Sequence, residues 1–174
     1  MKTNLCSTHF LLIWLIAALF ISGCGPVISQ EVRKEADQTI GFEELLANPD
    51  AYRGRMVLQG GEIIEARNLP ENTLIFLLQR PLGLRDEPSV DKESGGRFLV
   101  IVPGFLDPAI YRPGRKVTVA GAVEGKETHP LGEVQYTYPV ISKRELYLWP
   151  SEETTMTEPG VQFGVGIGIV IQGR

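Results

Sequence analysis

Hydrophobic residues in the middle of the chain recur mostly at every second position, the spacing that is typical of β-strands. The clearest case is residues 116–124, whose apolar or small face would hold Val117, Val119, Gly121 and Val123. Alternation, or a short continuous apolar run, predicts further strands at residues 55–59 with 62–65, 73–79, 97–102, 134–140 and 144–149. Helical spacing is scarce in comparison, so the chain is expected to fold mainly into β structure.

One short amphipathic helix is predicted before the strands, over residues 41–47. Phe42 and Leu45 lie on one face of this helix, and Pro49 ends it. The paired glycines at 60–61 interrupt the first strand and predict a β-bulge or a sharp bend, by which small barrels turn corners. A short helix followed by five or six strands with glycine bends predicts a small Greek-key barrel of OB type. A β-sandwich is the alternative.

A different pattern opens the chain. Residues 10–21 are uncharged and apolar, and Lys2 is the only basic residue before them. This run is shorter than the roughly 20 residues that a membrane-spanning helix needs, but it matches the apolar region of a secretory signal peptide. The residues that follow, Ile21-Ser22-Gly23-Cys24, resemble the lipobox of bacterial lipoproteins. In such proteins the leader is cut before the cysteine, which carries the acyl chains.

The lipobox implies a processing scheme and a location. Residues 1–23 are expected to be a lipoprotein signal peptide, and Cys24 is the expected lipidation site, carrying palmitate or similar acyl chains. Because Gly25, rather than Asp, follows Cys24, the sorting rule of Gram-negative lipoproteins implies an outer-membrane anchor facing the periplasm. Cys6 leaves with the leader, so the mature chain has no second thiol for a disulfide or a cysteine metal site.

The charge of the mature chain bears on its partners. The whole sequence has a net charge of −4, and residues 1–23 contain a single charged residue, Lys2, so the mature chain carries −5. An acidic chain of this kind is not expected to bind nucleic acid through bulk electrostatics. Its length suits one domain around one hydrophobic core.

The remaining segments divide by composition. Residues 24–38 are mostly polar and are predicted to form a lipid-anchored tether, and residues 39–150 form the predicted barrel domain. Residues 151–160 are predicted to be a polar linker. Residues 161–174 alternate apolar residues with glycine and predict an extra C-terminal strand. We expect this tail to pack on its own domain first and to mediate self-association second.

Several short motifs resemble the Slp family of outer-membrane lipoproteins over residues 38–150. The matching residues are Tyr52-Arg53-Gly54-Arg55 with Gly60-Gly61, Gln79-Arg80-Pro81-Leu82, Ser94-Gly95-Gly96-Arg97-Phe98, Gly104-Phe105-Leu106-Asp107-Pro108 with Tyr111, Gly121, Gly125, Tyr138-Pro139 and Leu148-Trp149. The resemblance implies a lipoprotein on the periplasmic face of the outer membrane. It implies no settled activity and no catalytic residues. The Gly-rich C-terminus departs from the aromatic- or proline-rich tail expected of such relatives.

Few residues suggest catalytic or metal-binding chemistry. His129 is the single histidine of the mature chain and precedes Pro130 in a predicted turn, where a solvated side chain is the simpler interpretation. Zinc sites of the usual kinds lack the residues they need, and a Ser-His-Asp triad would need His129. The polar loop at 80–96 gathers Asp86, Glu87, Asp91 and Glu93, for which a weak calcium site is one hypothesis. Carboxylate catalysis by Asp86, Asp91 and Glu93 is another. The Gly-rich motif at 164–168 lacks the spacing and the helix of a dinucleotide site.

The turn-rich connection at 103–115 supplies the candidate interaction surface. Phe105, Leu106 and Tyr111 are expected either to plug one end of the barrel or to form a recognition surface, since OB-type barrels bind ligands through loops and one strand face. The first functional hypothesis is a non-enzymatic structural or interaction module of the envelope, without a cofactor. The alternative is a module that binds a small ligand, namely a glycan, a lipid or calcium. An enzyme that uses carboxylates alone ranks third.

Overall fold

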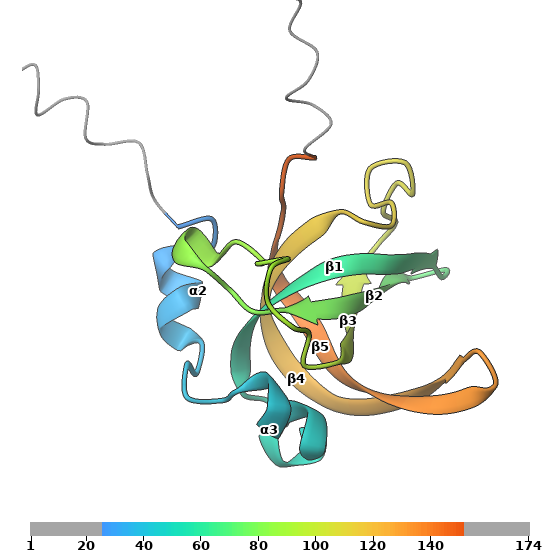
Figure 1. Ribbon diagram of the computed structural model, residues 1–174, viewed down its shortest axis with the longest axis horizontal. Helices are drawn as coiled ribbons and strands as arrows, with labels where there is room; N and C mark the ends of the chain where they lie inside the picture. The colour runs from blue at the N-terminus through green and yellow to red at the C-terminus, as the bar shows by residue number, and fades with distance from the viewer. Residues whose placement is uncertain (1–25, 152–174) are drawn as a thin grey trace, which may run out of the picture.

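A closed β-barrel of five strands forms the centre of the computed structural model, which describes residues 26–151 (Figure 1). The strands are β1 (Met56–Asn68), β2 (Asn72–Arg80), β3 (Arg97–Pro103), β4 (Lys116–Leu131) and β5 (Val134–Leu148). Their order around the barrel is β1-β2-β3-β5-β4, and the β3–β5 pair alone is parallel. The OB-type barrel predicted from the sequence is confirmed, and the β-sandwich is excluded because the sheet closes on itself.

The barrel interior is filled by alternate residues of every strand, as a period of two requires. Its core includes Val57 and Ile63 from β1, Ile75 and Leu77 from β2, Phe98 and Val100 from β3, Val117 and Val119 from β4, and Ile141 from β5. The glycine pair at 60–61 does not form the predicted bulge, because both residues stay in register with β2 and β4. The register shifts between Ile63 and Glu65 instead. The glycine at 61 serves close packing, since a Cβ atom there would lie 3.1 Å from Phe98.

The β4–β5 hairpin is longer than the sequence pattern indicated. The strands predicted separately at 134–140 and 144–149 form the single strand β5, which ends at Leu148, and His129 lies within β4 rather than in a turn. Residues of its strand β5, among them Tyr138 and Val140, pack with residues of β2 and β3. There the Tyr138 ring meets the Phe76 ring edge to face, with centroids 5.4 Å apart. The sequence did not predict the full length of the hairpin, because one face of it is polar and the apolar residues on which the other face packs lie far away in the sequence.

The N-terminal segment also differs from its prediction as a free tether. Residues 30–35 form helix α2 (Gln30–Glu35), and Ile28 and Val32 are buried with Ala120 on the outer face of the barrel. The predicted tether at 24–38 is therefore wrong for residues 28–36. Ile28 lies just before the helix, Val32 within it and Ala36 at its C-terminal cap, and the burial of all three explains why the segment docks.

The predicted helix at 41–47 is confirmed as α3 (Phe42–Ala47), which continues into a 3-10 turn, η1 (Pro49–Tyr52). Phe42 packs edge to face on Phe98, with ring centroids 5.8 Å apart. The 80–96 loop contains a second 3-10 turn, η2 (Leu84–Asp86). Between residues 26 and 151 no helix is long and apolar enough to cross a bilayer. The predicted lipidation site Cys24, the linker beyond Ser151 and the strand at 161–174 lie outside the described residues.

Candidate functional site

The connection between β3 and β4 closes one end of the barrel and is held by two polar side chains. The Asn68 side-chain amide donates to the Leu106 carbonyl at 3.0 Å, and the Thr73 hydroxyl donates to the Gly104 carbonyl at 2.8 Å. In return, the Leu106 amide donates to the Thr73 hydroxyl at 3.2 Å. These bonds satisfy backbone groups of a segment that has no regular secondary structure, so the connection has a defined conformation.

The three residues predicted to form an interaction surface face in different directions. Leu106 and Tyr111 pack against the barrel core, which confirms the plug interpretation for these two side chains. Phe105 instead is 73% exposed, and Ile110 is also exposed. Only Phe105 of the three thus has a side chain that points mainly to solvent.

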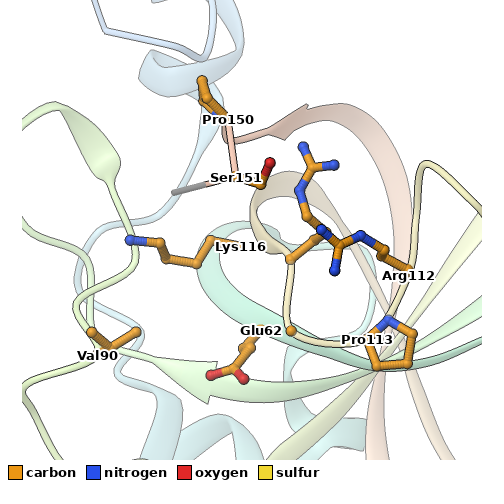
Figure 2. A pocket seen from close by; sticks show the side chains of 9 residues that line it. Glu62, Val90, Arg112, Pro113, Lys116, Pro150 and Ser151 are labelled. Atoms are coloured by element: carbon orange, nitrogen blue, oxygen red, sulfur yellow. The ribbon is translucent and has the colours of Figure 1, made fainter. Parts of the chain in front are cut away.

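Beyond Tyr111 the same connection turns sharply and places a group of basic residues around a cavity. Gly114 adopts a left-handed conformation with φ of 85°. Its amide donates to the Ile63 carbonyl at 2.9 Å, and the Ile63 amide donates to the Arg115 carbonyl at 2.9 Å. The turn therefore lies against β1. The cavity beside it has a volume of about 410 Å³ and is lined by Glu62, Val90, Arg112, Pro113, Gly114, Arg115, Lys116, Pro150 and Ser151 (Figure 2).

The lining of this cavity is predominantly cationic. Arg112, Arg115 and Lys116 contribute three positive charges, against one carboxylate from Glu62. That carboxylate is itself paired with Arg80, at 2.8 Å. Figure 2 shows the Lys116 side chain extended toward the loop that carries Val90. There its ammonium group pairs with Glu87 at 3.2 Å. Sequence reasoning missed this site, although a basic run around a Pro-Gly turn (YRPGRK, residues 111–116) was its visible signal.

Arg115 has the most informative environment of the three. One terminal nitrogen donates to the Trp149 carbonyl at 2.6 Å, and the other donates to the Ile110 carbonyl at 3.2 Å. The Nε atom is buried and, among the described residues, meets no hydrogen-bond partner. Because both of these acceptors are neutral, they do not compensate the guanidinium charge. Arginines in this situation suit carboxylate or phosphate oxygens.

The carboxylates of the 80–96 loop do not converge on a common point. Asp86 is buried and forms an ion pair with Arg33 of α2, while Glu87 pairs with Lys116. Asp91 and Glu93 are exposed. Within residues 26–151, no group of three or more His, Cys, Asp or Glu side chains has the geometry of a metal site. The hypotheses of a calcium site and of carboxylate catalysis thus find no assembled residues in the described part of the chain.

His129 lies on the outer arm of the hairpin. Its Nε2 atom is 2.9 Å from a Glu127 carboxylate oxygen. Its ring packs edge to face on Phe76, with centroids 5.2 Å apart. The imidazole covers an aromatic cluster and is only partly exposed, so the solvated turn expected for it is wrong.

The structure is thus a small OB-type barrel with one hydrophobic interior. The docked N-terminal segment covers part of its outer face, and the basic cavity lies beside the turn at Gly114. The chain belongs to the outer membrane lipoprotein Slp family, whose family model matches residues 21–166. The resemblance seen in the sequence motifs is therefore confirmed. The match includes the lipobox, and the protein is an outer-membrane lipoprotein.

Three relatives are similar to this chain over most of its length. The outer membrane protein Slp of Escherichia coli K12 is 25% identical over 145 residues, which cover 82% of this chain and 77% of the relative. The uncharacterized lipoprotein YeaY of the same strain is 26% identical over 142 residues, covering 82% and 73%. An uncharacterized protein of Haemophilus influenzae Rd is 32% identical over 124 residues, covering 71% and 67%.

A comparison with solved structures gives a weaker likeness. The structure of Schizosaccharomyces pombe Pot1pC bound to single-stranded DNA aligns with 58% of this chain and 83% of its own, at 12% identity and a TM-score of 0.31. A likeness at this level carries no argument about fold or ligand.

Proposed function

We propose that the mature chain is a non-enzymatic structural or interaction module, anchored by acyl chains on Cys24 to the periplasmic face of the outer membrane. Family membership and the lipobox support the anchor. The observation that carries the proposal is the burial of Ile28, only four residues after Cys24, against the outer face of the barrel. A membrane-bound cysteine at that distance holds the barrel itself close to the bilayer.

A non-enzymatic role is supported by how the titratable groups are used. Two side chains that the sequence singled out for chemistry are engaged in contacts within the protein: Asp86 with Arg33, and His129 with Glu127. The Glu145 carboxylate accepts two hydrogen bonds from Ser29. The Asp86 and Glu145 contacts join separate segments of the fold, and the His129 contact lies within β4.

The anchor is tested by metabolic labelling with radioactive palmitate and separation of the inner and outer membranes. The wild-type chain is expected to carry label and to appear in the outer membrane. The Cys24→Ala variant is expected to lose the label and to keep its leader, whereas Cys6→Ala, the matched control, is expected to behave as wild type. Equal labelling of the Cys24→Ala variant would contradict the proposal.

A second candidate function is the binding of a small anionic ligand, such as the acidic group of an envelope glycan or lipid. The cationic cavity favours it, because Arg112, Arg115 and Lys116 all line it. The basic lining disfavours calcium among the ligands considered from the sequence.

Thermal unfolding tests this second function, because a ligand that binds only the folded state raises the melting temperature. Inorganic phosphate and acidic sugars are expected to raise it for the wild type and less for Arg112→Ala. Arg144→Ala removes the same charge from an exposed position on β5 and is the control. If no anion in such a panel raises the melting temperature, the second function is contradicted.

We also propose that residues 161–174 pack on the barrel and, second to that, mediate self-association. Their alternation of apolar residues with glycine supports the proposal. Truncation after Ser151, followed by light scattering and thermal unfolding, separates the two roles. A lower melting temperature in a monomer supports packing, loss of an oligomer supports association, and no change in either contradicts both.

A further inference from the structure

The 3-10 turn η2 exposes a large apolar side chain completely. Leu84, its first residue, is 94% exposed, while Val90 of the same loop is half-exposed. An isolated exposed leucine on a protein surface needs no explanation. Leu84 differs because the loop that presents it has an unusual and well-fixed backbone.

The two residues that follow Leu84 both adopt left-handed conformations, with φ of 64° at Arg85 and at Asp86. Such conformations are unfavourable for residues other than glycine and persist only where surrounding contacts impose them. Here the contacts centre on Asp86. Its side chain is buried and paired with Arg33, and its carbonyl accepts a hydrogen bond of 2.6 Å from the Thr118 hydroxyl. The loop is thus built to hold Leu84 outward.

The same contacts place η2 beside the N-terminal end of the mature chain. Arg33 belongs to α2, and Figure 1 shows η2 next to the end of α2 at which the chain enters. Ile28 is buried just before this helix. Only one residue, Gly25, separates Pro26, the first described residue, from Cys24. At about 3.3–3.6 Å per residue, the Cα atom of Cys24 lies within about 7 Å of that of Pro26, whatever conformation the chain takes.

We propose that Leu84 inserts into the bilayer that holds the acylated Cys24, and that the α2–η2 side of the barrel is the face that lies on the membrane. This inference rests on the proposed lipid anchor. A fixed loop that presents a leucine within a short distance of the acyl chains buries apolar surface at no cost in ordering the loop. The hairpin turn before Val134 points to the opposite side of the barrel (Figure 1).

A fluorescent probe on single cysteines tests the orientation, because the mature chain has no thiol other than that of Cys24. Leu84→Cys, Phe105→Cys and Val134→Cys, all at exposed apolar positions, are purified in the acylated form and labelled with an NBD dye. The chains are reconstituted in vesicles of phosphatidylethanolamine and phosphatidylglycerol. Lipids with brominated acyl chains are expected to quench the probe at position 84 several-fold more than the probe at position 134. Iodide in the water phase is expected to show the reverse order.

Two failures are distinguishable. Intact mass is measured first, and a chain without acyl groups overturns the proposed anchor together with this inference. An acylated chain whose probe at position 84 is as accessible to iodide as the probe at position 134 overturns the orientation alone. Lipid quenching at position 105 in place of position 84 also overturns it, since the barrel would then dock by its β3–β4 end.

Discussion

Ser29 donates two hydrogen bonds to the carboxylate of Glu145, one from its backbone amide at 2.8 Å and one from its hydroxyl at 2.6 Å. The two residues are 116 positions apart in the sequence, and the contact joins the start of α2 to strand β5. The Ser29 hydroxyl also accepts from the Val32 amide, so it caps the helix as well. This contact fixes the first structured residues after Cys24 on the barrel.

Removal of the Glu145 carboxylate is expected to loosen the N-terminal segment. Glu145→Ala should lower the free energy of unfolding by about 1 kcal/mol, because hydrogen bonds to a charged group stabilise but this group is partly exposed. Urea unfolding of the purified mature chain measures the change. Glu133→Ala, in the exposed hairpin turn, is the control and should fall within about 0.5 kcal/mol of wild type. Equal effects of the two variants would contradict the role given to Glu145.

The same contact gives stability a dependence on pH. The hydrogen bonds from Ser29 hold the pKa of the Glu145 carboxyl below its ordinary value of 4.5. A carboxyl whose pKa is lowered on folding contributes stability above its unfolded pKa and loses it as pH falls through the folded pKa. The difference in melting temperature between wild type and Glu145→Ala should thus be full at neutral pH and shrink below pH 4.5. A difference that is constant down to strongly acidic pH would contradict this assignment.

The ion pair between Arg33 and Asp86 is expected to matter more than the surface ion pairs. The Asp86 side chain is 5% exposed and that of Arg33 is 36% exposed. Arg33→Ala would leave a buried carboxylate without its cation, and we expect a loss of about 2 kcal/mol, less than for a fully buried pair. Lys34→Ala, on the exposed side of the same helix, should change stability by less than about 0.5 kcal/mol. Denaturant unfolding compares the two, and similar losses would disprove the special role of the pair.

Gly121 is expected to tolerate no side chain. A Cβ atom at this position in β4 would collide with the backbone carbonyl oxygen of Ser142 and lie 2.7 Å from the Ile141 side chain. Neither atom is a flexible chain end, so Gly121→Ala should cost about 2–3 kcal/mol. Gly83→Ala is the control, because its Cβ would meet nothing closer than 3.5 Å. Thermal unfolding measures both, and a Gly121→Ala variant as stable as the control would contradict the packing described.

The barrel could be predicted from the sequence because its interior depends on local alternation. Val117 and Val119 of β4 alternate with neighbours that face the outside of the barrel, whereas β2 and β3 were marked by short continuous apolar runs. The prediction failed where the burying partner is remote in the sequence. Tyr138 looked like part of a short, separate strand, but its ring packs on Phe76 of β2, which no local pattern indicates.

The docked N-terminal segment was missed although its signal was present. Ile28, Val32 and Ala36 are spaced by four residues, but the charged residues between them made the segment look like a polar tether.

The basic cavity was missed for a different reason. Arg112 and Arg115 are close in sequence, whereas the cavity exists only because Glu62, on β1, is brought beside them.

The intact mass of the mature chain, purified from separated outer membranes, tests the lipid anchor most directly. The account predicts a chain whose first residue is Cys24 and whose acyl groups are carried by that residue. A mature chain that begins at another residue, or one whose Cys24 is unmodified, would contradict the anchor and the close placement of the barrel on the membrane.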